Sequence, residues 1–204
     1  MSRLPVVVRH AEPEDAAALV ELWSSCVDLA GTEAADSVNA PSLWRQPSTA
    51  EAATALDAYV SSPDRRLMVA LLDGEIVGVL AVQLRPLTPI HTTRTMIVSD
   101  LHISPACRRK FVASTLMSSA VSWAEECDCE VVLTSAPVNS RDAHRFLTRL
   151  GFGQVATVRG AQVSVLRSRF AGIATSSRDT GRLIAVRRTL RRRQDSGRKL
   201  RPGL

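Results

Sequence analysis

Residues 99–126 read SDLHISPACRRKFVASTLMSSAVSWAEE, and this stretch decides the fold. The apolar run that ends at Ile103 predicts a strand, Pro105 ends it, and three basic residues at 108–110 precede a helical pattern. One face of that helix carries Val112, Leu116, Ala120 and Trp123. A helix N-terminus presents unpaired N–H groups and the positive end of the helix dipole, so this segment is suited to hold a diphosphate.

The segment after this helix predicts a further strand and a short helix. Glu130 to Leu133 is an apolar run, and residues 141–152 read RDAHRFLTRLGF. Gly151 in the C′ position predicts that the helix ends at Leu150. Two later runs, Phe152–Val158 and Gln162–Leu166, predict a final β pair.

The N-terminal half predicts an antiparallel meander preceded by two helices. The expected elements are a strand at Pro5–His10, a helix opening at Pro13, a loop at 31–47, a helix from the capping box Ser48–Glu51 to Val60, a hairpin of Arg66–Leu72 and Glu75–Leu84 around Asp73-Gly74, and a strand at Thr95–Ile103. A meander followed by β-α-β crossovers predicts an α/β fold, a mixed antiparallel and parallel sheet with helices on both faces.

Two motifs in this order resemble the signatures of the GNAT acetyltransferase superfamily. Residues 108–113, RRKFVA, are similar to its acetyl-coenzyme A pattern Arg/Gln-x-x-Gly-x-Gly/Ala, and residues 141–152 are similar to its second signature, which ends in Leu-Gly-Phe. The resemblance covers the chain from about Val6 to Arg167. It implies a GNAT-like domain at 1–167, followed by a linker at 168–181 and a basic tail at 182–204.

The resemblance implies that acetyl-CoA is the co-substrate and that an acceptor amine attacks its thioester directly. It assigns three groups of residues to the co-substrate and no metal. The strand residues that would pair with the pantetheine arm are Leu101, His102 and Ile103. Those that would hold the pyrophosphate are Arg108, Arg109, Lys110, Phe111, Val112 and Ala113, and those that would contact pantetheine from the second signature are Asn139 and Ser140.

The sequence departs from the family pattern at two positions. Phe111 stands where the motif has glycine, and a non-glycine residue in a left-handed conformation costs about 1–2 kcal/mol, so we expect weakened acetyl-CoA binding. The alternative is that Phe111 packs in the core at the helix start. Leu147 stands where the family often has a tyrosine that protonates the leaving thiolate, and the only tyrosine, Tyr59, falls in the second helix, where we expect no substitute.

Asp100 is the candidate general base, because many family members carry an acidic residue on this strand. A neutral attacking amine needs a group that takes its proton. The alternative for Asp100 is a carboxylate that anchors the strand end. His102 lies on the same strand face as Asp100. The simpler interpretation of His102 is that it is a partly buried packing residue.

The charge of the chain is concentrated in its tail. Residues 182–204 hold nine Arg or Lys and one acid, whereas residues 1–181 hold 17 basic and 19 acidic residues. The tail is suited to an anionic partner such as nucleic acid, the ribosome or RNA polymerase. Rival readings are therefore a non-catalytic GNAT-like binding protein that docks through this tail, and a toxin-type acetyltransferase that acts on aminoacyl-tRNA.

Composition excludes several classes. A hydrophobic fraction of 45% and a charged fraction of 23% are ordinary for a globular protein, and no apolar run is long enough to span a membrane. The four cysteines form no CxxC pair, so we expect free thiols, no metal and a cytoplasmic protein. The sequence leaves open the acceptor amine and whether the chain forms a homodimer.

Overall fold

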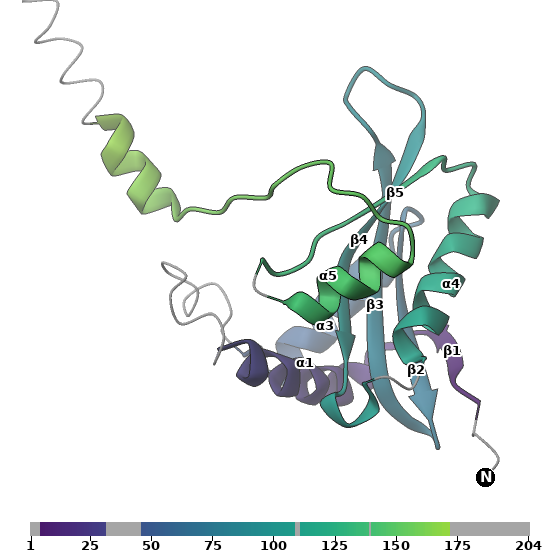
Figure 1. The fold of residues 1–204 in the computed structure, drawn as a ribbon. Helices are drawn as coiled ribbons and strands as arrows, with labels where there is room; N and C mark the ends of the chain where they lie inside the picture. Colours follow the sequence, from purple (N-terminus) through teal and green to yellow (C-terminus); the bar gives the residue numbers. More distant parts are fainter. Residues whose placement is uncertain (1–4, 32–45, 109–110, 139, 172–204) are drawn as a thin grey trace, which may run out of the picture. The chain divides into compact units, whose positions relative to one another are not determined.

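The computed structural model describes residues 5–31, 46–108, 111–138 and 140–171 (Figure 1). Most of the predicted loop at 31–47 lies outside these ranges, as do the predicted tail at 182–204 and most of the predicted linker. The chain divides into two units, Met1–Ala156 and Thr157–Leu204. The two units are described separately below, and the division into domain, linker and tail stays a prediction.

The first unit is built on one five-stranded sheet with the order β1-β2-β3-β4-β5. Neighbouring strands run antiparallel from β1 to β4, and β5 runs parallel to β4. This arrangement confirms the predicted mixed sheet. The strands are β1 (Val7–His10), β2 (Arg65–Leu72), β3 (Glu75–Pro86), β4 (Arg94–Ile103) and β5 (Val131–Thr134).

The hairpin between β2 and β3 forms where the sequence predicts it. Asp73 and Gly74 both have positive φ, 56° and 86°. A two-residue turn with positive φ at both positions matches the twist of the flanking strands. This turn sets the register of β3 against β2, which starts with Leu72 opposite Glu75.

Two helix ends form at the residues that the sequence predicts. Ser48 accepts a hydrogen bond from the Glu51 backbone N–H at 3.2 Å. At the other end of the unit, Gly151 (φ 92°) ends the last helix, and the Phe152 N–H donates back to the Leu147 carbonyl at 3.0 Å. The helices are η1 (Pro13–Asp15), α1 (Ala16–Gly31), α3 (Thr49–Val60), η2 (Pro105–Cys107), α4 (Val112–Glu126) and α5 (Arg141–Arg149).

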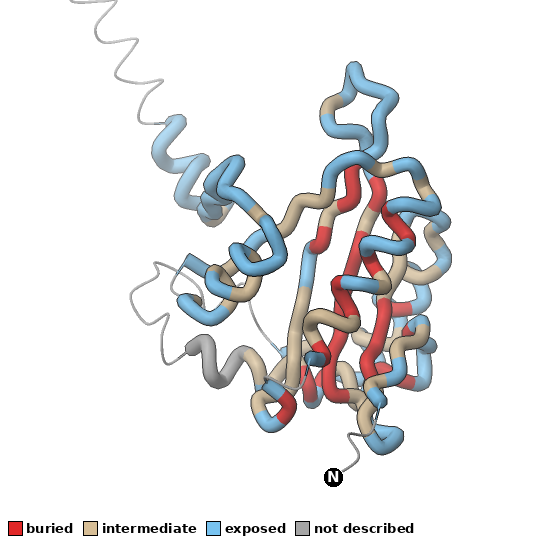
Figure 2. Tube along the Cα trace, turned by 45° about the vertical axis from the view of Figure 1, so that its right-hand side comes forward, coloured by how far each residue is buried: buried red, intermediate tan, exposed pale blue. Residues whose placement is uncertain are grey.

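Each face of the sheet carries its own apolar core, as predicted. Along β2, Met68 and Ala70 belong to the core under α4, whereas Val69 between them belongs to the core under α1 and α3. This alternation follows from the period of two along a strand. Figure 2 shows the buried residues running along the central strands and along the inner side of α4.

Gly78 lets α4 approach β3 closely. A Cβ atom at this position would lie 2.9 Å from the Ile103 Cδ1 atom and 2.9 Å from the Val112 Cγ1 atom. These distances are shorter than real Cβ contacts, so a larger residue at this position would force the Ile103 and Val112 side chains to move. The close packing of the first turn of α4 on β3 therefore fits a glycine here.

The predicted final β pair is wrong. Residues 152–162 form no strand, and residues 163–171 form a helix that belongs to the second unit. The Leu166 N–H donates to the Gln162 carbonyl at 3.1 Å, a helical bond. Val163, Leu166 and Phe170 are spaced as one helix face, and a short apolar run of this kind does not distinguish a strand from a helix.

Candidate active site

The strands β4 and β5 separate in the middle of β4. Their parallel pairing ends at Val98 and Thr134, while β4 continues to Ile103. At the same point the register with β3 shifts: Ala81 pairs with Asp100, and Val82 pairs with Val98, so Ser99 is the extra residue of a bulge. Bulges re-aim side chains, and they are frequent beside active sites.

The backbone of Leu101 and Ile103 points to the edge that β5 leaves open. The Ser104 N–H donates to the Val77 carbonyl of β3 at 2.8 Å. Because strand residues alternate between the two sides, the backbone groups of Ile103 and Leu101 point away from β3, and those of His102 point toward it. Two of the three residues predicted to pair with pantetheine thus lie with their backbone groups at an open edge.

Asp100 and His102 form an ion pair on the sheet face that α1 and α3 cover. His102 pairs across strands with Val79, which belongs to the core under these helices. The His102 Nε2 atom lies 3.6 Å from the Asp100 Oδ1 atom, and the two side chains are 26% and 52% exposed. The pair places one carboxylate and one imidazole beside the open edge.

The two groups shift each other's titration. The neighbouring His102 imidazole lowers the pKa of the Asp100 carboxyl from its usual value, although burial of the carboxyl opposes this shift. Asp100, together with the Cys26 thiol, raises the pKa of His102 to about 9. At neutral pH Asp100 is therefore ionised and His102 holds a proton.

Cys26 of α1 belongs to this cluster, although the sequence analysis did not select it. Its half-buried thiol donates to the Ile103 carbonyl with a Sγ–O distance of 3.5 Å. The thiol also contributes to the raised pKa of His102. A residue 77 positions away from Ile103 has no local pattern that could place it there.

Tyr59 reaches the bulge, contrary to the expectation from sequence. Its hydroxyl donates to the Val82 carbonyl at 3.0 Å. Burial raises the pKa of the Tyr59 phenol, while the nearby Ser99 hydroxyl lowers it and the Asp100 charge raises it further. The one tyrosine of the chain thus lies beside Ser99 and Asp100.

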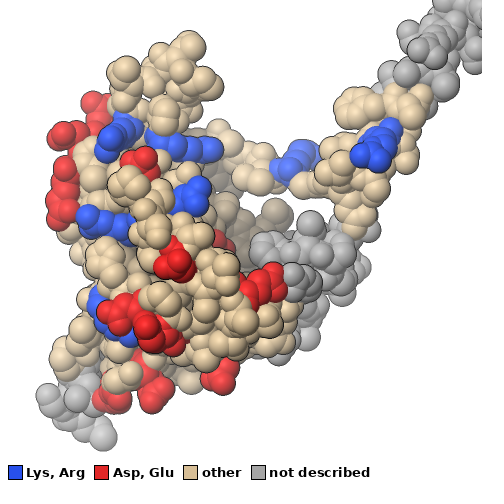
Figure 3. All heavy atoms as spheres, turned by 180° about the vertical axis from the view of Figure 1, so that it is seen from behind, with Lys and Arg blue, Asp and Glu red and all other residues tan. Residues whose placement is uncertain are grey.

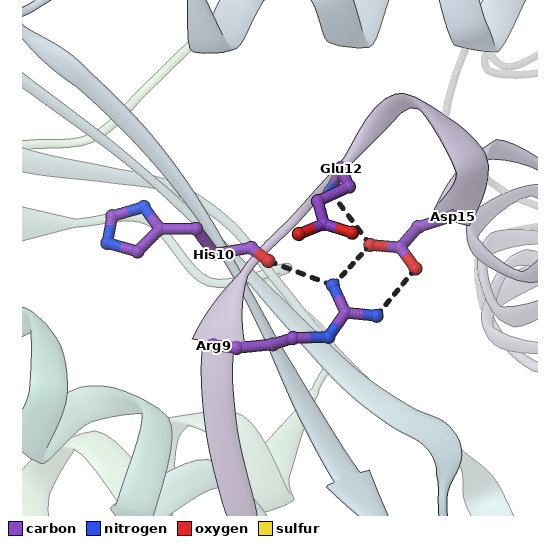
Figure 4. A network of polar contacts seen from close by, with 4 residues as sticks. All are labelled: Arg9, His10, Glu12 and Asp15. Atoms are coloured by element: carbon purple, nitrogen blue, oxygen red, sulfur yellow. Dashed lines mark hydrogen bonds and ion pairs between the residues drawn. The ribbon is translucent and has the colours of Figure 1, made fainter.

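An ion pair anchors the start of α1, the helix that carries Cys26. Arg9 donates two hydrogen bonds to the Asp15 carboxylate, at 2.6 and 2.7 Å, and the Glu12 N–H donates to the same group at 2.8 Å (Figure 4). The hydrogen bond from Arg9 lowers the pKa of the Asp15 carboxyl. These bonds join β1 to the first turn before α1.

The α4 N-terminus lies beyond the end of β4, and Phe111, the residue just before the helix, is strained. Phe111 has φ 65° and ψ 2°, a left-handed conformation, and it is 59% exposed. The alternative that Phe111 packs in the core is therefore wrong. Val112 is buried, and the first helical bond runs from the Thr115 N–H to the Phe111 carbonyl at 2.9 Å. The N–H groups of this first turn have no acceptor within the helix.

The remaining predicted residues are placed as follows. Arg108 is exposed and ends η2, and Ala113 is half-buried in the first turn of α4. Ser140 caps α5 by accepting from the Ala143 N–H at 3.4 Å. The predicted residues outside the described ranges are Arg109, Lys110 and Asn139.

No group of three or more metal-ligating side chains occurs among the described residues. No helix in the described ranges is long and apolar enough to cross a membrane. A surface depression at the opposite end of β4 contains none of the predicted site residues; it is lined by Thr92, Thr93, Arg94, Glu126, Cys127 and Asp128.

The first unit thus combines a sheet that opens at a bulge with a helix N-terminus beyond the end of β4. The profile of the acetyltransferase (GNAT) family matches residues 32–152, more than half of the chain. The chain belongs to this family, whose members take their acyl group from acyl-CoA.

The curated relative is distant and partial. Aminoalkylphosphonate N-acetyltransferase from Salmonella typhimurium is 28% identical over 97 residues, which are 48% of this chain and 62% of that protein. The chain thus matches less than two thirds of the length of this relative.

Solved structures support the fold. An acetyltransferase from Trypanosoma brucei is 18% identical with a TM-score of 0.59, and the match covers 78% of this chain and 100% of that one. An aminoglycoside N-acetyltransferase in complex with CoA is 12% identical with a TM-score of 0.61, covering 79% and 96%. At these identities the likeness concerns the fold alone.

Proposed function

We propose that this protein is an acetyl-CoA-dependent N-acetyltransferase that acts on a primary amine. The observation that carries the proposal is the Asp100–His102 pair beside the open edge of β4. An amide-bearing arm can pair with the backbone groups of Leu101 and Ile103 there, and a diphosphate can accept from the N–H groups of the α4 N-terminus. One elongated molecule with both features fits acyl-CoA.

Asp100 is the residue that we propose to take the proton of the attacking amine. Its lowered pKa keeps it ionised at neutral pH, so it attracts an ammonium group and accepts a proton directly or through a water molecule. A weak base of this kind is adequate when the leaving group is a thiolate, whose conjugate acid has a pKa of about 8.5. Tyr59 and Ser99 hold the bulge on which Asp100 stands.

The experiment is a turnover assay that follows CoA release with a panel of primary amines. The panel contains small aminoalkylphosphonates, because the curated relative acts on that class, together with aminoglycosides and peptides with free N-termini. We expect Asp100→Asn to lower kcat by about 10²-fold, the lower end of a general-base contribution. Asp128→Asn is the matched control, because Asp128 is an exposed acid at the far end of α4. Equal loss in both variants, or none in either, contradicts the role of Asp100.

The tail supports a second function, the docking of an anionic partner. Residues 182–204 carry nine of the 26 basic residues, and the rest of the chain is slightly acidic. On the face seen in Figure 3, basic and acidic side chains are both spread over the surface. We therefore propose that nucleic acid or the ribosome engages the tail rather than the body, and that the protein works in the cytoplasm.

A further inference from the structure

We propose that Tyr59 is a positioning residue of the transfer site, whose hydroxyl fixes the bulge of β4 and thereby sets where the Asp100 carboxylate stands. The inference rests on the proposed function, in which Asp100 takes the proton of the attacking amine. It makes the rate of transfer depend on a side chain of α3, an element that carries none of the residues predicted to hold acetyl-CoA.

The bulge decides which face of the sheet Asp100 occupies. Before the bulge of β4, Val98 pairs with Val82, and after it Asp100 pairs with Ala81. If the first register continued without the extra residue, Asp100 would stand opposite Leu80, which is fully buried in the core under α4. The extra residue instead turns the carboxylate to the face that α1 and α3 cover, where its side chain is 52% exposed.

Two side-chain hydroxyls bind the strand opposite the bulge, where the ladder is locally disrupted. Tyr59 donates to the Val82 carbonyl at 3.0 Å. Ser99 donates to the Ala81 carbonyl at 3.4 Å. The bond from Tyr59 is the shorter of the two, and it alone comes from another element, so it ties this part of the sheet to α3.

The end of α3 that carries Tyr59 is itself fixed to β3. The Leu84 N–H donates at 2.7 Å to the carbonyl of Asp64, in the turn after α3. Leu84 lies two residues from Val82, so the turn and the Tyr59 hydroxyl hold neighbouring points of one strand. The Arg65 guanidinium also lies over the Tyr59 ring, 5.4 Å from its centroid. Removal of the hydroxyl alone would therefore leave the ring and α3 in place.

The Tyr59 hydroxyl is a donor at the pH of the reaction. Burial raises the pKa of this phenol, so it keeps its proton at neutral pH. Phenylalanine has the same ring without the donor, and in Tyr59→Phe the bulge loses its bond to α3. A general base must lie within hydrogen-bond reach of the proton that it takes, so a displaced Asp100 carboxylate lowers the rate of the chemical step.

The experiment is a double-mutant cycle in which CoA release is followed with an amine that the wild type acetylates. Tyr59→Phe should lower kcat by about tenfold, less than the roughly 10²-fold that a misplacement of about 1 Å can cost, because the register and the Ser99 bond remain. The KM for acetyl-CoA should stay within about twofold, because the backbone edge at 101–103 is unchanged. In the Asp100→Asn background, Tyr59→Phe should lower kcat by less than about twofold, because the carboxylate through which Tyr59 acts is absent.

Ser61→Ala is the matched control. Ser61 is the C-cap of α3, two residues after Tyr59, and its hydroxyl donates to the Asp57 carbonyl at 2.8 Å. This variant also removes one hydroxyl and one bond to a backbone carbonyl at the same helix end, but it does not touch the bulge. We expect it to keep the wild-type kcat.

Three results overturn the positioning role and leave Asp100 as the proposed base: a wild-type kcat in Tyr59→Phe, an equal loss from Tyr59→Phe in both backgrounds, or the same loss in Ser61→Ala. If Asp100→Asn itself keeps the wild-type kcat, the proposed role of Asp100 fails and the inference fails with it. If the wild type acetylates no amine of the panel, the proposed function fails as a whole. The thermal midpoint of each variant shows whether the chain was folded.

Discussion

The strained backbone at Phe111 leads to a prediction that separates stability from binding. A non-glycine residue in a left-handed conformation costs about 1–2 kcal/mol, and Phe111 has φ 65° in the free chain. Phe111→Gly removes this strain but adds about 0.5–1 kcal/mol of backbone entropy to the unfolded chain. We therefore expect the free energy of unfolding to rise by about 0.5–1 kcal/mol.

The structure also changes what we expect for binding. The sequence analysis predicts that Phe111 weakens the affinity for acetyl-CoA and that glycine at this position would restore it. Because the strain is already present without ligand, its relief is common to the free and bound states and cancels from the binding free energy. We expect the Kd for acetyl-CoA to change by well under the tenfold that about 1.4 kcal/mol would give.

Urea unfolding of Phe111→Gly and Phe111→Ala tests this reasoning. Alanine removes the exposed phenyl ring but retains the strain, so it should bring no gain, whereas glycine should. At about 2–4 °C per kcal/mol for a chain of this size, the thermal midpoint of the glycine variant should rise by about 1–4 °C. Equal stability of the two variants would refute the assignment of strain to this residue.

Three further predictions follow from the anchor, the bulge and the tail. Asp15→Asn should lower the free energy of unfolding by about 1.5–3 kcal/mol in urea titrations near neutral pH. The pKa of the Asp15 carboxyl is lower in the folded chain than in the unfolded chain. The stabilisation is therefore present above the unfolded-state pKa and is lost as the pH falls through the folded-state pKa. Tyr59→Phe should cost about 1 kcal/mol by the same measurement, because the Val82 carbonyl loses its donor; an unchanged value would contradict the bond. Deletion of the residues after Gly181 should keep the thermal midpoint but abolish the mobility shift with duplex DNA. The affinity of the full chain for this DNA should fall with salt concentration, with a log–log slope of about −0.9 per neutralised phosphate. Retained DNA binding by the truncated chain would exclude the tail as the binding segment.

Local sequence patterns predicted most of the sheet and its helices. The Asp73-Gly74 turn, the Ser48 cap and the Gly151 helix stop each depend on a few neighbouring residues, and each forms as expected. The prediction of a β pair at 152–158 and 162–166 was wrong, because a segment forms a strand only where it pairs with another strand. An apolar run of this length carries no information on whether it will find one.

The site was predicted less completely, because its geometry depends on contacts between distant residues. Asp100 and His102 could be selected from the strand pattern, but the Cys26 thiol that reaches the nearby Ile103 carbonyl comes from α1, 77 positions away. Tyr59 was placed in the correct helix and judged remote, yet its hydroxyl reaches the bulge. The bulge itself is one register shift at Ser99, and no composition or spacing in the sequence marks it.

The most direct test of the central claim is titration calorimetry of the full chain with acetyl-CoA. The open edge of β4 and the α4 N-terminus predict one binding site per chain, and the same titration with acetate and with inorganic phosphate should give no comparable heat. If neither the wild type nor Phe111→Gly binds acetyl-CoA, the proposed acetyltransferase activity is contradicted.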